Sequence, residues 1–121
     1  MKAHKSGGKC LVFVCSGAAY VGELTDRAAR QLRQEGLADM SCLASIGARD
    51  PDIMFNTDLA ERILLIDGCP KACSRRTFEL ANLKRFSHFD LSELGLAKGK
   101  SKATAERIRI VVRKAAEMLK A

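Results

Sequence analysis

The chain has 121 residues, 47% of them hydrophobic and 29% charged, which is typical of one folded domain and excludes a disordered or fibrous protein. No stretch approaches the roughly 20 consecutive apolar residues that a membrane-spanning helix needs, so we expect no membrane partner. The formal net charge is +7, but most of the excess falls in residues 98–121 and aromatic residues are few, which disfavours nucleic-acid binding.

The N-terminal residues 1–8 are basic and polar, and we expect a flexible tail at the start of a single domain that spans residues 1–121. No apolar segment with a small-residue cleavage site follows them, so the pattern of a secretory signal is missing. We therefore expect a cytoplasmic protein. In that compartment its five cysteines stay reduced and are available for metal binding or catalysis.

The first half of the chain predicts a strand, a helix and a second strand. Residues 10–14 form a continuous apolar run that ends in a turn at Cys15, which predicts a buried strand. Apolar residues recur every four positions in residues 21–34, which predicts a helix that ends at Gly36. A short strand is expected at residues 39–44, where apolar side chains partly alternate with polar ones.

The second half of the chain alternates strands and helices in the same way. Residues 62–66 are the clearest strand, because consecutive apolar residues are typical of a parallel sheet that is covered on both faces. Pro70 suits the first turn of a helix, which predicts a helix from Cys69 to about residue 83. The other expected elements are a loop at 49–52, a short helix at 56–62, a strand at 85–90 and a final helix capped by Ser101.

This alternation predicts a small three-layer α/β domain with a four-stranded parallel sheet in the order 2-1-3-4. In such sheets ligands bind beyond the carboxyl ends of the strands, where the strand order reverses. Here that point lies between the first and third strands. Cys15 follows the first strand, Cys69 follows the third, and Cys42 falls late in the second, so we expect these cysteines to meet at one edge.

The expected helix start brings a further cysteine to this edge. Cys69 and Cys73 are four residues apart, which places them one turn apart on the same helix face. A helix N-terminus favours thiolate over thiol. With Cys15 and Cys42 the set reaches four sulfurs, the number that a closed tetrahedral zinc site requires. An iron–sulfur cluster is the other candidate for thiolate ligands, and zinc is favoured.

Other residues that carry chemistry receive simpler roles. Cys10 begins an apolar strand and is expected to be a small buried hydrophobe. His4 and His88 are expected to be bystanders and not metal ligands. Asp67 is expected to form the turn before Gly68. An alternative role for Asp67 is proton acceptor in a catalytic metal site with three cysteine ligands.

Three segments of the chain resemble the DGC domain, a zinc-binding family named for its central Asp-Gly-Cys. The resemblance extends from about residue 10 to about residue 98, with one departure at Tyr20, where the family more often has Asn. It implies four chelating cysteines and does not supply a reaction. The segments are Cys15-Ser-Gly-Ala-Ala, Cys42-Leu-Ala-Ser-Ile-Gly and Ile66-Asp67-Gly68-Cys69-Pro70-Lys71-Ala72-Cys73, and the implied ligands are Cys15, Cys42, Cys69 and Cys73.

The function we expect is therefore zinc binding, in a structural, sensory or metal-handling role, with no enzyme activity assigned. A thiol-disulfide oxidoreductase using Cys69 and Cys73 is the main alternative, although three residues separate this pair where redox pairs have two. A phosphatase-type cysteine loop is disfavoured because Val21 stands where an arginine would bind the oxyanion. A phosphate-binding loop over residues 95–101 has one residue too few.

Overall fold

The structure is a computed structural model, which describes residues 9–120. The tail expected at residues 1–8, with His4, lies outside the described residues. Four parallel strands form one sheet in the order β2-β1-β3-β4, which confirms the predicted topology. The strands are β1 (Cys10–Val14), β2 (Asp39–Met40), β3 (Arg62–Asp67) and β4 (Ser87–Asp90).

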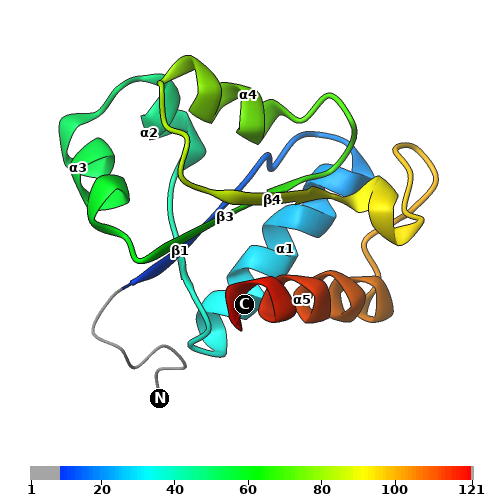
Figure 1. Ribbon diagram of the computed structural model, residues 1–121. Coiled ribbons are helices and arrows are strands. Elements are labelled where there is room, and N and C mark those ends of the chain that lie inside the picture. Colours follow the sequence, from blue (N-terminus) through cyan, green and yellow to red (C-terminus); the bar gives the residue numbers. More distant parts are fainter. Residues whose placement is uncertain (1–8, 121) are drawn as a thin grey trace.

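Helices cover both faces of the sheet and give the predicted three layers (Figure 1). One layer contains α1 (Tyr20–Gln34) and α5 (Ala105–Lys120). The opposite layer contains α2 (Leu43–Gly47), α3 (Pro51–Leu59) and α4 (Cys73–Leu80), and a short 3₁₀ helix, η1 (Leu91–Leu94), follows β4. Within residues 9–120 no helix is both long enough and apolar enough to cross a membrane.

The apolar strands β1 and β3 supply both halves of the core, because successive side chains of a strand point to opposite faces. One set packs against α1 and α5, and the other packs against α2 and α4. The first set is Val12, Val14, Leu64 and Ile66, and the second is Leu11, Phe13, Ile63 and Leu65, which meet Ile46 and Phe78. This two-sided burial explains why neither strand alternates apolar with polar residues.

Two boundaries near the predicted site differ from the sequence-based expectation. The second strand stops at Met40, and Cys42 is the N-cap of α2, so its placement in a strand was wrong. Helix α4 begins at Cys73, and Cys69 therefore does not lie on it. Pro70 instead occupies the second position of a tight turn, in which the Ala72 amide donates to the Cys69 carbonyl at 3.0 Å.

Two other helices also begin at different residues from those expected. Helix α3 begins at Pro51 because the preceding Asp50 side chain caps it, so the predicted loop at 49–52 ends too late and the predicted helix at 56–62 begins and ends too late. Thr104 accepts a hydrogen bond from the first turn of α5. Ser101, the predicted cap, accepts instead from the Ala97 amide at 3.0 Å.

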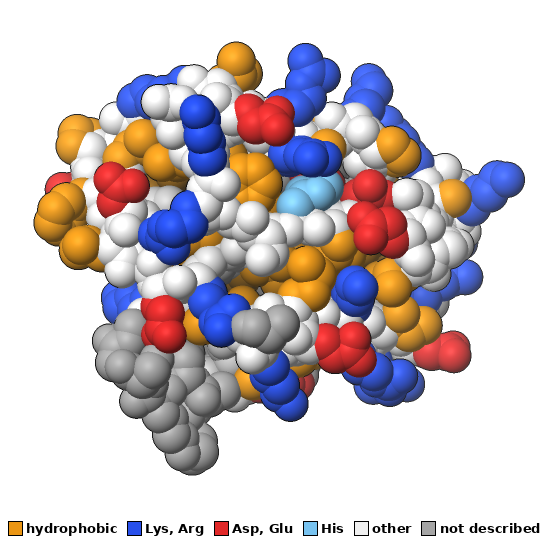
Figure 2. Space-filling model, in the orientation of Figure 1, with side chains coloured by type: hydrophobic (Ala, Val, Ile, Leu, Met, Phe, Trp, Pro, Cys, Tyr) orange, Lys and Arg blue, Asp and Glu red, His pale blue; other side chains and the backbone are white. Residues whose placement is uncertain are grey.

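The surface carries charged side chains of both signs. Figure 2 shows Lys and Arg side chains spread over the face in view and interspersed with Asp and Glu, without one continuous basic surface. Among residues 9–120, the large exposed apolar side chains are Tyr20, Phe55, Leu59 and Leu80. On this face, the excess positive charge of the chain is therefore not gathered into a single binding patch.

Replacing Phe78 by alanine tests how α4 packs against the sheet. The Phe78 ring is fully buried and meets the Phe13 ring edge-on, with 4.8 Å between ring centroids. We expect Phe78→Ala to lower the free energy of unfolding by about 3–5 kcal/mol in urea denaturation, through lost burial and the cavity left behind. Leu80→Ala is the control, because this side chain on the same helix is 78% exposed. Equal losses for the two variants would contradict the packing described.

Candidate functional site

A cavity of about 300 Å³ lies at the carboxyl ends of β1 and β3, where the strand order reverses. Three of the four predicted cysteine ligands line it, namely Cys15, Cys69 and Cys73. Its wall also includes the first turn of α1 and two lysines, Lys71 and Lys98. The structure thus brings together thiols from three places in the sequence beside two positive charges.

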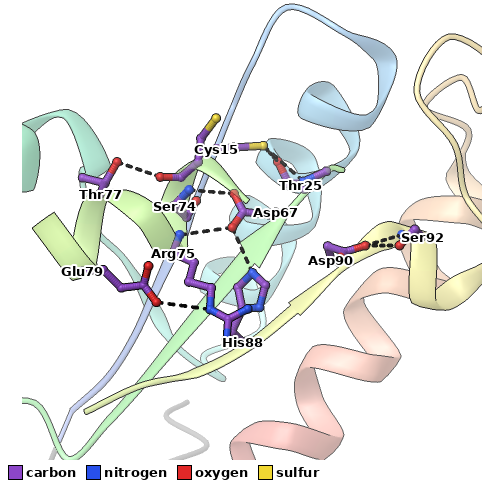
Figure 3. A network of polar contacts seen from close by, with 12 residues as sticks. Cys15, Thr25, Asp67, Ser74, Arg75, Thr77, Glu79, His88, Asp90 and Ser92 are labelled. Atoms are coloured by element: carbon purple, nitrogen blue, oxygen red, sulfur yellow. Dashed lines mark hydrogen bonds and ion pairs between the residues drawn. The ribbon is translucent and has the colours of Figure 1, made fainter. Parts of the chain in front are cut away.

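The Cys15 sulfur is held against the turn that follows β3. Its Sγ accepts a hydrogen bond from the Gly68 amide at 3.3 Å and lies 3.5 Å from the Thr25 hydroxyl (Figure 3). Thr25 is fully buried on α1 and donates to the Gly22 carbonyl at 2.9 Å. The position of this thiol therefore depends on both β3 and α1.

Asp67 is the last residue of β3 and fixes the end of the cysteine-bearing turn, which is formed by residues 68–72 and contains Cys69. Its carboxylate is 1% exposed and accepts hydrogen bonds from the amides of Ser74 and Arg75, at 2.8 and 3.2 Å, and from His88 Nε2 at 2.9 Å (Figure 3). Asp67 therefore serves as a cap for α4 from outside the helix, and its predicted role as a simple turn former was incomplete.

His88 is a structural partner in this site, although the sequence indicated only a bystander. It lies on β4 and is joined to Asp67 across neighbouring strands. The sequence signal for this contact is weak, because Asp67 directly follows the predicted strand at 62–66 whereas His88 falls within the predicted strand at 85–90. That signal could not be used, because the pairing register was not predictable from the sequence.

Close packing of glycine backbones brings the first turn of α1 against the cysteine-bearing turn. A Cβ on Gly68 would lie 2.9 Å from Val21 Cγ2, and a Cβ on Gly22 would lie 2.3 Å from the Gly17 carbonyl oxygen. Neither position has room for a side chain. These contacts set the distance between the two walls of the cavity.

Cys42, the fourth predicted ligand, lines a different cavity of about 660 Å³. Cys15 belongs to the wall of both cavities, and Arg30 and Arg33 line the second. Cys42 is exposed, and hydrogen bonding from Ser45 lowers the pKa of its thiol.

Cys10 differs from the other four cysteines in its surroundings. It is buried among core residues on β1, which confirms its predicted role as a small hydrophobe. Burial raises the pKa of its thiol, and the nearby Glu61 carboxylate raises it further. Cys10 is therefore the least suited of the five cysteines to bind a metal or to react.

The cavity residues fit a thiolate-bound metal in chemical type, but not in their present arrangement. Three cysteines line one cavity, and soft thiolates are preferred ligands of zinc. Among residues 9–120, however, no three Cys, His, Asp or Glu side chains lie close enough together to hold an ion. Binding would require the sulfurs to turn toward a common point, while Cys42 would have to cross from the neighbouring cavity.

Comparison with known proteins agrees with the resemblance noted from the sequence. A model of the DGC domain family matches residues 11–115. The chain is also 35% identical over 88 residues to AnvM of Pseudomonas aeruginosa, which is named an anaerobic and virulence modulator. The aligned region covers 73% of this chain and 67% of that relative. No solved structure matches the chain.

The three hydrogen bonds of Asp67 can be tested by Asp67→Ala. This change leaves the amides of Ser74 and Arg75 without their acceptor. We therefore expect the free energy of unfolding to fall by about 2 kcal/mol or more, measured in the presence of a chelator. Asp58→Ala is the control, because Asp58 is an exposed carboxylate on α3. Unfolding curves that coincide for both variants would show that Asp67 does not hold α4.

Gly68→Ala tests the contact between the cysteine-bearing turn and α1. The added methyl group would overlap Val21, so we expect unfolding to become easier by about 1–3 kcal/mol. Gly17→Ala is matched to it, since a Cβ there meets no atom within 4 Å and should change stability by at most about 0.5 kcal/mol. If Gly68→Ala proves as stable as Gly17→Ala in thermal unfolding, the close approach described above is wrong.

Proposed function

Because the chain belongs to the DGC domain family, we propose that it is a small regulatory protein whose cysteines bind a zinc ion at the carboxyl edge of the sheet. The observation that carries this proposal is the shared cavity of Cys15, Cys69 and Cys73, which come from two different loops and the start of a helix. Three thiols at the ligand-binding edge of an α/β sheet are more than core packing requires.

The proposed ligands are the four cysteines predicted from the sequence, with three in one cavity and Cys42 beside it. Zinc bound by thiolates supplies a cross-link between distant segments, and its binding free energy adds to that of folding. Four thiolates around one zinc ion carry a net charge of about −2. Lys71 and Lys98, which line the cavity, support the proposal because they would offset that charge.

In this proposal Asp67 and His88 support the metal ligands and do not bind the ion themselves. They are not proposed as ligands, because the Asp67 carboxylate is already occupied by two amides and by the His88 ring. Their role is to fix where α4 begins, and with it the position of Cys73. Supporting groups of this kind orient the ligands of many metal sites.

A regulatory role is proposed by analogy with AnvM, which is named a modulator and shares 35% identity with this chain over 88 residues. Gain or loss of the ion would change the order of residues 69–72, a turn that is partly exposed at the surface of the molecule. Such a change is a local event that a partner protein can detect. The partner itself stays unassigned.

A thiol-disulfide oxidoreductase is the second candidate. It is favoured by the presence of two free thiols, Cys69 and Cys73, in one cavity, with Cys73 at the first position of a helix. The third thiol, Cys15, has no role in that reaction. The redox candidate also predicts a fold that does not depend on metal, which separates it from the zinc proposal.

Measurement of the metal content of the purified protein tests the zinc proposal directly. We expect about one zinc ion per chain in the wild type, and loss of the ion in Cys69→Ser. Cys10→Ala is the matched control, because Cys10 is buried on β1 away from the cavity and should keep the ion. If the site is structural, removal of the zinc by a chelator should also lower the melting temperature, since zinc can contribute on the order of 10 kcal/mol to such folds.

Three outcomes of the metal measurement separate the candidates. Iron with inorganic sulfide in place of zinc would assign an iron–sulfur cluster to the same thiols. A metal-free protein of unchanged stability that forms a reversible Cys69–Cys73 disulfide would favour the oxidoreductase. A protein without metal, in which every thiol reacts independently, would refute the zinc proposal.

A further inference from the structure

The cavity of about 660 Å³ lies beyond the carboxyl ends of β1 and β2, and part of its wall has no role in the proposed function. The residues that directly follow these two strands form one side of the wall, and α1 forms another. The α1 side carries three charged residues, Asp26, Arg30 and Arg33. The carboxyl edge of an α/β sheet is the place where such folds bind ligands.

Asp26 orients the Arg30 guanidinium. Arg30 Nε donates to one carboxylate oxygen of Asp26 at 2.8 Å, and the Ser16 hydroxyl donates to the other at 2.9 Å. Ser16 has a left-handed conformation with φ of 48°, which is uncommon for serine. Within residues 9–120, Nη1 and Nη2 of Arg30 make no hydrogen bond. The end of this guanidinium is therefore free to donate two parallel hydrogen bonds to an anion.

Arg33 adds a second cation to the same wall. It lies three residues after Arg30 on α1, which places the two side chains on one side of the helix. Both are exposed to solvent and thus open to an incoming anion, and no described side chain pairs with Arg33. Asp26 is the one acidic residue among the described residues of this wall, so the two arginines leave one net positive charge.

The remainder of the wall suits an apolar group. Val14, Met40 and Leu43 line the cavity beside the arginines. A volume of about 660 Å³ falls within the range of roughly 300–1,000 Å³ that is typical of small-molecule sites, and it is much larger than a carboxylate alone requires. A ligand that fills the cavity would therefore combine an anionic group with an apolar body.

We propose that this cavity binds a small organic monocarboxylate. Its carboxylate lies against Arg30 and Arg33, and its apolar body packs on Val14, Met40 and Leu43. The single net positive charge of the wall matches one carboxylate and would leave part of a phosphate dianion unpaired. The arginines are not proposed zinc ligands, so this inference goes beyond the proposed function and does not depend on it.

Titration of the ¹⁵N-labelled protein with phenylacetate, followed by NMR, tests the site and its location together. We expect saturable shifts of the amide signals of Arg33 and residues 41–44, which border the cavity. Acetate has the charge without the ring, and 2-phenylethanol has the ring without the charge. Each should bind at least about tenfold more weakly than phenylacetate, because each loses one of the two kinds of contact.

Arginine variants in the same titration test the charged wall. Arg30→Gln and Arg33→Gln should each raise the dissociation constant of phenylacetate by about fivefold or more, through loss of charge-assisted hydrogen bonds. Arg27→Gln is the matched control and should leave it unchanged. Arg27 lies on the same helix and pairs with Glu23 at 3.0 Å, as Arg30 pairs with Asp26, but it does not line the cavity.

Four outcomes would overturn the inference. They are the absence of saturable phenylacetate binding, shifts confined to other parts of the chain, equal effects of Arg27→Gln and Arg30→Gln, and tighter binding of phenyl phosphate than of phenylacetate. None of them bears on the zinc proposal, because the metal content of Arg33→Gln should equal that of the wild type. A protein without zinc that still binds phenylacetate at this cavity would refute the proposed function and leave the inference standing.

Discussion

The buried carboxylate of Asp67 is the contact on which the candidate site depends. It joins the end of β3 to the first turn of α4 through two amides, and to β4 through His88. A carboxylate that is 1% exposed needs such partners, because an unpaired charge in the core is costly. With β3 and α4 joined at this point, the five residues between Asp67 and Cys73 form a short connection with both ends fixed. Cys69 lies inside that connection, so its freedom is limited by a neighbour that is not itself a proposed ligand.

Much of the fold was predictable from the sequence, because its strands have a simple physical signature. The apolar runs in β1 and β3 indicated a sheet covered on both faces, and the alternation with helices indicated parallel strands in the observed order. Helix boundaries were less predictable. Pro70 fits the second position of a tight turn as well as it fits the first turn of a helix, and the sequence contains no local sign of which applies. The left-handed conformation of Ala72, with φ of 53°, interrupts the chain before α4, so Pro70 lies in a turn. The sequence did not indicate this conformation.

The sequence predicted that Cys15, Cys69 and Cys73 lie at one edge of the sheet, but it did not predict the internal arrangement of the candidate site. Strand order alone was sufficient to bring Cys15 and Cys69 to one edge, because the carboxyl ends of β1 and β3 are neighbours in the sheet. The separation of Cys42 from the other thiols could not be predicted, since it follows from a two-residue β2 and a turn into α2. The contact between Asp67 and His88 was also missed, because it joins positions 21 residues apart across two strands.

The position of Cys15 in the walls of both cavities has a consequence for chemical damage. This single residue belongs to the boundary between the three-thiol cavity and the arginine-lined cavity. A bulky adduct attached to it would crowd the two compartments simultaneously and would break its hydrogen bond with the Gly68 amide. An adduct on Cys42 would leave the smaller compartment untouched. Electrophiles that reach one thiol or the other would thus impair the molecule to very different extents.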